Sequence, residues 1–170
     1  GFDLYCRLLQ EAVQEIKGEI PEEGPEPSID LRVGAYIPDE YIADKKLKVG
    51  FYQRLSQMAR EEQVDEAREE MRDRFGRLPD PTSILLDLVS IKLLARSARL
   101  RSVTVRDEGL MISYPEGRYP TKEQIGALTK DGSHHIEFPG SALFQIKVNL
   151  TDSTGVERVD ITKKMLQKLV

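Results

Sequence analysis

The residues best suited to chemistry in this sequence are the carboxylates of a highly charged segment at 61–76. Placed on a helix at about 100° per residue, its apolar residues form one narrow stripe: Val64, Ala67, Met71 and Phe75. The opposite side is acidic: Glu62, Glu66, Glu69 and Asp73. Glu70 lies on the shoulder of that acidic face, and Arg68 and Arg72 share one flank. Such a face is either a solvated helix surface or a docking surface for a basic partner, and the charge pattern leaves both interpretations open.

No catalytic motif accompanies these carboxylates. The sequence has no glycine-rich phosphate loop, no GxSxG or HExxH motif, and only one cysteine, Cys6. The only histidines, His134 and His135, are neighbours on an expected strand, so they would point to opposite faces and not bind one metal ion. We therefore expect no active site, metal site or cofactor in this sequence. A stand-alone enzyme would need a pocket that perturbs the pKa of an acid or base.

A second charged group is basic and runs from Lys92 through Arg96, Arg99 and Arg101 to Arg106. These side chains could contact phosphate. The net charge of −4 and the isoelectric point of about 5.4 argue against tight nucleic-acid binding, which needs a clear excess of cations on one face. Aromatic residues, which would stack on bases, make up only 6% of the chain.

The bulk composition indicates a soluble protein of the cytoplasm. No apolar run approaches the roughly 20 residues that span a membrane, and no signal peptide is visible. One cysteine in 170 residues allows no internal disulfide and favours a reducing compartment. Because the sequence starts at Gly1 and enters a helical pattern directly, we expect it to be a piece of a longer protein.

The elements that must position these charges follow from periodicity and breaker residues. Residues 2–17 have helical spacing, and the acidic, proline-rich segment 18–27 predicts a linker. We therefore expect residues 1–27 to lead into a domain at 28–170. Alternation predicts a strand at 29–37, and apolar spacing predicts helices at 45–59, at 61–75 and from near Thr82. Gly76 and the prolines of the turn at 77–81 should end the acidic helix sharply.

The second half of the chain mixes strands and helices. Strands are expected at 102–106 and 110–114 around a turn at 107–109, and a second pair is expected at 134–138 and 142–150. A capping box predicts a helix at 121–128, and another helix is expected at 156–169. The predicted fold class is α+β: a helical cluster packed beside a small, mainly antiparallel sheet.

Four segments read together resemble a known family. They are GFDLYCRLLQEAV (1–13), IDLRVGAYIPDEYIAD (29–44), FYQRL (51–55) and DRFGRLPDP (73–81). In this order and at these spacings they are similar to the C-terminal end of bacterial transcription-repair coupling factors (Mfd). The resemblance is specific from Gly1 to about Leu100 and weaker from Ser102 to Val170.

The resemblance implies a non-catalytic regulatory domain of a larger protein. The resemblance implies that the full-length protein is an ATP-dependent DNA translocase of helicase superfamily 2. It would displace stalled RNA polymerase and recruit UvrA in nucleotide excision repair of DNA damage. ATP and magnesium would bind its motor, outside this sequence. Its C-terminal domain folds back on a UvrB-like N-terminal module of the same protein, covers the surface that UvrA would use, and so acts by autoinhibition.

The resemblance also assigns residues to this docking contact. The family's acidic contact residues, just before its Arg-Phe-Gly element, match Glu70 and Asp73, and Arg74 belongs to the same motif. Three positions apart on a helix, the two carboxylates share a side. The alternative is a module that contacts DNA or RNA polymerase through the basic residues from Lys92 to Arg106.

Overall fold

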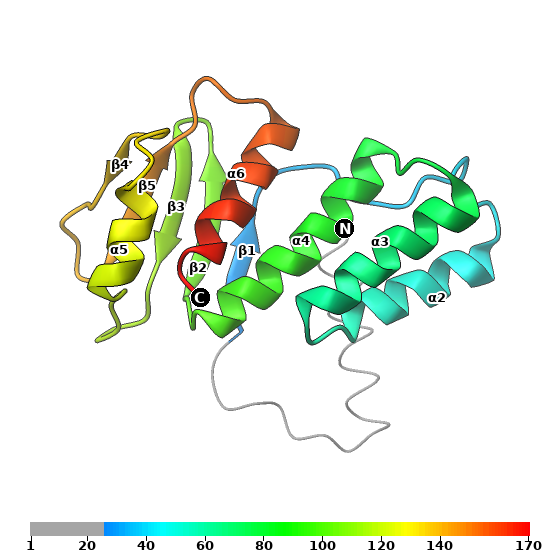
Figure 1. Cartoon of the computed structure of the whole chain (residues 1–170), viewed down its shortest axis with the longest axis horizontal. Helices are drawn as coiled ribbons and strands as arrows, with labels where there is room; N and C mark the ends of the chain where they lie inside the picture. Colours follow the sequence, from blue (N-terminus) through cyan, green and yellow to red (C-terminus); the bar gives the residue numbers. More distant parts are fainter. Residues whose placement is uncertain (1–25) are drawn as a thin grey trace, which may run out of the picture. The chain divides into compact units, whose positions relative to one another are not determined.

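A computed structural model describes residues 26–170 of this chain, which form two compact units (Figure 1). The first unit comprises residues 34–90, and the second comprises residues 26–33 together with 91–170. The predicted helix at 2–17 and nearly all of the predicted linker at 18–27 lie outside the described residues. The domain boundary at residue 27 therefore stays a prediction.

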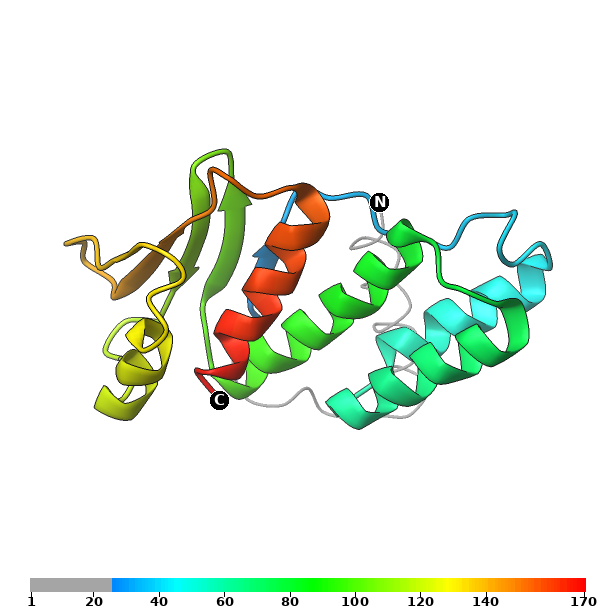
Figure 2. The same cartoon turned by 45° about the horizontal axis from the view of Figure 1, so that its top comes forward.

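The first unit is helical. It contains α2 (Lys45–Ser56), α3 (Glu61–Phe75) and the first part of α4 (Asp80–Ser97), with α2 and α3 side by side in both views (Figures 1 and 2). Asp44 caps α2, because its side chain accepts a hydrogen bond of 3.0 Å from the amide of Leu47. The apolar stripe predicted for α3 is buried at Val64, Ala67 and Met71. The same core includes Phe51, Leu55, Leu85 and Leu86.

The strand predicted at 29–37 is much shorter in the structure. The strand β1 covers only Ser28–Asp30, although burial continues to alternate, with Leu31, Ala35 and Ile37 buried. The ladder ends because Arg32 has a positive φ of 50° and its amide donates to the Asp30 side chain at 3.3 Å. Period-2 burial thus marks an extended segment here, and only its first residues have a strand partner.

The second unit is built on a five-stranded sheet in the order β1-β2-β3-β5-β4. Its remaining strands are β2 (Ser102–Arg106), β3 (Gly109–Ser113), β4 (Ile136–Glu137) and β5 (Gln145–Asn149). β1 pairs with β2 in parallel, and the other three pairs are antiparallel. Both predicted strand pairs are therefore present, with shorter strands in the second pair.

One face of this sheet is apolar and forms the core of the second unit. Residues from three neighbouring strands lie opposite one another in register and are at most 3% exposed: Val103, Val105, Leu110, Ile112, Ile146 and Val148. The helices α5 (Lys122–Thr129) and α6 (Gly155–Gln167) begin with capping boxes at Thr121 and Thr154. Their buried residues, including Leu128 and Leu166, complete this core.

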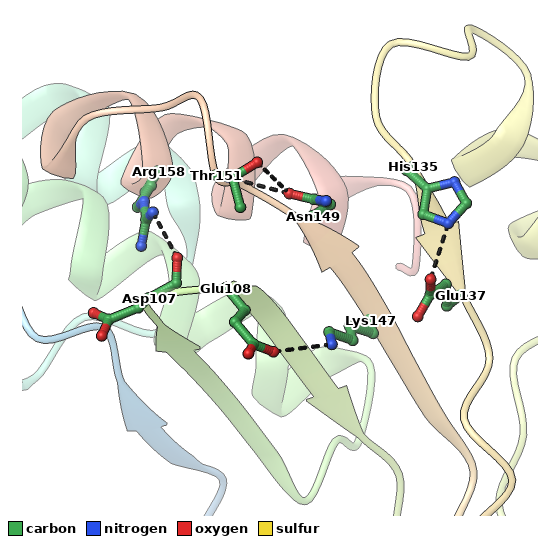
Figure 3. Close-up of polar contacts among 8 residues, drawn as sticks. All are labelled: Asp107, Glu108, His135, Glu137, Lys147, Asn149, Thr151 and Arg158. Atoms are coloured by element: carbon green, nitrogen blue, oxygen red, sulfur yellow. Dashed lines mark hydrogen bonds and ion pairs between the residues drawn. The ribbon is translucent and has the colours of Figure 1, made fainter.

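A single arginine joins α6 to the turn between β2 and β3 and to the end of β5. The guanidinium of Arg158 donates to the carbonyl of Asp107 at 3.0 Å (Figure 3). It also donates to the carbonyls of Arg106 at 2.9 Å and Leu150 at 3.0 Å. Gly109 follows this turn with φ of 156°, and a Cβ there would lie 2.1 Å from the carbonyl oxygen of Val148. The close approach of β5 therefore requires glycine at this position.

The predicted α+β class with a mainly antiparallel sheet is confirmed. Five helices and a five-stranded sheet are present among residues 26–170. Within these residues no helix has both the length and the apolar character needed to cross a membrane.

Candidate docking site

Two sets of contacts hold the end of helix α3 in place. The helix end at Gly76 was predicted from the sequence, and the contact with Tyr41 was not. Gly76 ends the helix with φ of 86°, as predicted, and its amide donates to the carbonyl of Arg72 at 2.9 Å. The hydroxyl of Tyr41 lies between the carbonyl oxygens of Met71, at 3.0 Å, and Gly76, at 2.8 Å. Tyr41 therefore links the carbonyl of Met71, in the last part of α3, to that of Gly76, the residue that ends the helix.

An aromatic cluster supports this end of the helix. The ring of Phe75 makes edge contacts with Tyr41, at a centroid distance of 5.7 Å, and with Phe51, at 5.9 Å. Phe51 is only 4% exposed, so the cluster reaches into the core of the first unit. Phe75 therefore anchors the last turn of α3, which contains Asp73 and Arg74 and directly follows the turn that contains Glu70.

Both carboxylate oxygens of Glu70 are bound by arginines of the same unit. Oε1 accepts a hydrogen bond from Arg54 of α2 at 2.9 Å, and Oε2 accepts one from Arg74 at 3.4 Å. The hydrogen bond from Arg54 is the main reason that the pKa of Glu70 is lower than usual, opposed in part by burial. Glu70 is thus ionised and already paired within its own unit.

Arg74 is positioned by rings as well as by this carboxylate. Its guanidinium carbon lies 5.1 Å from the centroid of Phe75 and 5.8 Å from that of Phe51, both within cation–π range. Glu70 precedes Arg74 by four residues on α3, which is the favourable order for a helical ion pair. The side chain of Arg74 is 48% exposed, so its remaining donors face solvent.

Asp73 differs from Glu70 in its surroundings. It is exposed, and among residues 26–170 no side chain forms a hydrogen bond or ion pair with its carboxylate. The structure therefore brings Glu70 and Arg74 into contact and leaves Asp73 as the unpaired charge of the three predicted site residues. Whether these residues bind a partner stays a prediction.

The sequence reasoning missed Arg54 as a member of this site. Arg54 lies on α2 and is 40% exposed, and it precedes Glu70 by 16 positions. The segment FYQRL, which carries part of the family resemblance, contains both Phe51 and Arg54. Its presence in that segment was the one signal in the sequence that Arg54 belongs to the site. Helical periodicity within α3 could not show that a side chain of another helix binds Glu70.

Two other arginines of α3 are paired with carboxylates, and several of its acidic residues line a surface hollow. Arg68 donates to Asp87 at 2.7 Å and to Ser83 at 3.0 Å, which joins α3 to α4 within the first unit. Arg72 pairs with Glu69 at 2.8 Å. A shallow surface hollow lies along the acidic side of α3 and is lined by Asp65, Glu66, Glu69, Glu70, Asp73 and Arg74.

Most of the alternative basic group is paired with carboxylates. Arg96 binds Glu26 at 2.8 Å, Lys92 lies 3.9 Å from the same carboxylate, and Arg106 binds Asp30 at 3.1 Å. These pairs reduce the positive charge that the segment from Lys92 to Arg106 presents. The contact of this segment with DNA or polymerase stays an untested alternative. Among residues 26–170, no group of three His, Cys, Asp or Glu residues could hold a metal ion.

Comparison with known proteins shows which family this chain resembles. The TRCF domain model matches residues 31–125, more than half of the chain and the whole of α3. Transcription-repair-coupling factors are similar to this chain in Myxococcus xanthus (38% identity over 113 residues, 66% of this chain), Rickettsia prowazekii (35% over 162, 94%) and Escherichia coli K12 (32% over 179, 99%). The chain spans 9%, 14% and 15% of those proteins, respectively.

A solved structure shows the same fold. It is the crystal structure of a C-terminal domain of transcription-repair coupling factor, with a TM-score of 0.71 and 21% identity, covering 85% of this chain and 93% of that domain. The predicted resemblance is thus confirmed by a family model, by relatives and by a fold. This chain belongs to the transcription-repair coupling factor family and contains its TRCF domain.

Proposed function

We propose that this chain is the autoinhibitory docking domain of a transcription-repair coupling factor. It would bind, through the end of α3, to a UvrB-like N-terminal module of the same protein. The observation that supports this most directly is that the end of α3 is held in place by contacts within its own unit. Charged side chains of Glu70, Asp73 and Arg74 are presented there on a backbone held by Tyr41, Phe75 and Gly76.

In this proposal the parent protein is an ATP-dependent DNA translocase of helicase superfamily 2 that acts in the cytoplasm. It displaces stalled RNA polymerase from DNA and recruits UvrA for nucleotide excision repair. ATP and magnesium bind the motor and not this chain, which contributes no catalytic residue. Docking of this domain covers the UvrA-binding surface of the UvrB-like module and keeps the motor at low activity.

The energetics of exposed ion pairs suit a releasable contact. Each such pair contributes about 0 to 1 kcal/mol, so a few pairs would hold two separate molecules together weakly. Within one chain, a connecting segment supplies an effective concentration on the order of mM, which keeps the closed state populated. A polymerase or DNA ligand then needs to favour the open state by only a few kcal/mol.

Charge reversal in the full-length protein tests this function. We expect Glu70→Lys with Asp73→Lys to increase UvrA binding and the basal ATPase rate, because the reversed charges repel the docked module. The matched control is Glu62→Lys with Glu66→Lys, which makes the same change in charge nearer the start of α3. UvrA binding and ATPase activity that do not change in the Glu70 and Asp73 variant would contradict the proposed function.

A further inference from the structure

The basic residues near the end of α4 have no role in the proposed docking of α3, and they lie close together in the second unit. Lys92 and Arg96 are one turn apart on the same side of α4. Arg99 and Arg101 follow between the end of α4 and the start of β2, and both are exposed. We call these four residues the basic strip.

One carboxylate covers the first half of the basic strip. Glu26, two positions before β1, accepts hydrogen bonds from Nη2 of Arg96 at 2.8 Å and 3.0 Å, and its Oε2 lies 3.9 Å from Nζ of Lys92. Strand pairing holds the backbone beside it, because the amide of Ser28 donates to the carbonyl of Arg101 at 3.0 Å. The strip therefore already binds an anionic group in this structure.

The contact with Glu26 is suited to displacement. Arg96 reaches both carboxylate oxygens from one nitrogen, so the planar fork of its guanidinium does not match the carboxylate in the bidentate way that gives the strongest pairs. The side chain of Glu26 is 59% exposed, and exposed ion pairs are weak. A ligand with several negative charges can therefore replace Glu26 without disturbing the core of the unit.

The second half of the basic strip has no anion. Within residues 26–170, neither Arg99 nor Arg101 forms a side-chain hydrogen bond or an ion pair. Arg99 also has a positive φ of 55°, a conformation that glycine or asparagine usually adopts after a helix end. An unpaired cation in this uncommon conformation points to a role other than local stability.

A nucleic-acid backbone fits the basic strip better than a folded acidic surface does. Guanidinium and ammonium groups bind phosphate oxygens as well as carboxylates. Lys92 and Arg96 are roughly 6 Å apart along the helix axis, and each DNA strand carries a phosphate about every 3.4 Å along its axis, so the two cations match a run of phosphates. Binding a polyanion also releases its condensed counterions, a gain that a folded acidic surface lacks.

We propose that the basic strip is a weak, sequence-independent binding site for a nucleic-acid backbone, and that Glu26 occupies its first half until phosphates displace it. Glu26 thus acts as an intramolecular competitor. The net charge of −4 opposes binding, so we expect a dissociation constant of about 10⁻⁴ M at physiological salt, the weak end of the non-specific range. This inference goes beyond the proposed function and does not depend on it, because the docking of α3 uses other residues.

The first test is the binding of this chain to a fluorescently labelled DNA duplex at about 50 mM salt, measured by anisotropy. We expect Glu26→Gln to strengthen binding by about two- to fivefold, because the competitor loses its charge. The matched control is Glu116→Gln, which removes the same charge from another exposed position of the second unit and should leave binding unchanged. Unchanged binding in Glu26→Gln, or an equal gain in both variants, would overturn the inference.

Variants in the second half of the basic strip test direct contact with phosphate. In the Glu26→Gln background, we expect Arg99→Gln and Arg101→Gln each to weaken binding by about two- to fivefold and to reduce the slope of log affinity against log salt by about one. Arg118→Gln is the matched control, because it removes one positive charge from an exposed loop before α5. Equal effects of Arg99→Gln and Arg118→Gln would show that only net charge matters, and no phosphate-binding strip would then exist.

Competition separates nucleic acid from an acidic protein as the ligand. We expect a polyglutamate peptide to displace the labelled duplex about tenfold less well than unlabelled DNA of the same total charge, because its charge is less dense and releases fewer counterions. Equal displacement by the two polyanions would overturn the assignment to nucleic acid. These measurements use no UvrB-like module, so their failure would leave the proposed function standing.

Discussion

At the residue scale, the hydroxyl of Tyr41 determines how firmly the docking residues are held. The hydroxyl of Tyr41 lies within hydrogen-bond distance of the carbonyl oxygens of Met71 and Gly76, from a segment 30 or more positions earlier in the chain. The ring of Tyr41 also contacts Phe75. One side chain therefore contributes both a polar cap and an apolar contact to the turn that carries Asp73 and Arg74.

We expect Tyr41→Phe to lower the free energy of unfolding by about 1 kcal/mol, the usual contribution of a lost hydrogen bond. Burial raises the pKa of the Tyr41 hydroxyl above its ordinary value of 10.0. A raised pKa in the folded state means that this contribution is complete below pH 10 and is lost as pH increases through the folded-state pKa. Urea unfolding measured from pH 8 to 11 tests both statements.

The control for this prediction is Tyr36→Phe. Tyr36 is 50% exposed, and its hydroxyl forms no hydrogen bond with residues 26–170. We expect no change in stability from that variant. Equal losses in the two variants would show that the hydroxyl of Tyr41 does not cap α3.

At the element scale, the second unit depends on one side chain to join three elements. Arg158 of α6 donates to the carbonyl of Asp107 in the β2–β3 turn (Figure 3). It also donates to the carbonyls of Arg106 and of Leu150 after β5, and its Nε donates to the carbonyl of Ser153 at 3.3 Å. The contacts of Lys147 with Glu108 and of His135 with Glu137, near the same strands, are exposed (Figure 3). A planar guanidinium carries five N–H donors spread over a fixed fork, whereas an ammonium group carries three donors on one atom and reaches fewer carbonyls that lie apart.

We expect Arg158→Lys to lower the free energy of unfolding by about 2 kcal/mol, because several carbonyls lose their donor while the charge is kept. Hydrogen exchange should become faster in the amides of β2 and β3 near the turn. The control is Lys164→Gln on the same helix. It breaks only an exposed pair with Asp160, so we expect no measurable change. An Arg158→Lys variant with unchanged stability and exchange would show that the turn is held by other contacts.

At the scale of the whole molecule, the proposed contact combines weak ion pairs with a covalent connection. The net charge of the chain is −4, so long-range attraction to a positive surface is modest and is screened by salt. The Debye length falls from about 10 Å at 0.1 M salt to about 3 Å at 1 M. Exposed pairs between separate molecules should therefore be much more sensitive to salt than a tethered contact.

We expect the affinity of this chain for the separate UvrB-like module to fall several-fold between low salt and about 0.5 M salt. In the full-length protein, the closed state should persist over the same range, because the connection keeps the effective concentration high. Titration calorimetry measures the first quantity, and UvrA binding by the full-length protein measures the second. An affinity that does not change with salt would show that apolar contacts and not charges hold the domain.

The sequence by itself determined the elements and the family. Helix starts at Asp44 and Thr121 and the helix end at Gly76 follow from interactions within a few residues, which is the range that capping and periodicity report. The family resemblance implies that Glu70, Asp73 and Arg74 are docking residues, and this role stays a prediction.

Only the tertiary structure decided which charges are free. Glu70 and Asp73 look equivalent on α3, yet Arg54 of α2 binds one and leaves the other exposed. Likewise, alternating burial continued to Ile37, but the backbone at Arg32 ended the strand at Asp30. The physical reason is that a pattern along one element reports which face is apolar, whereas the partner of a charge or a strand is set by packing between elements distant in sequence.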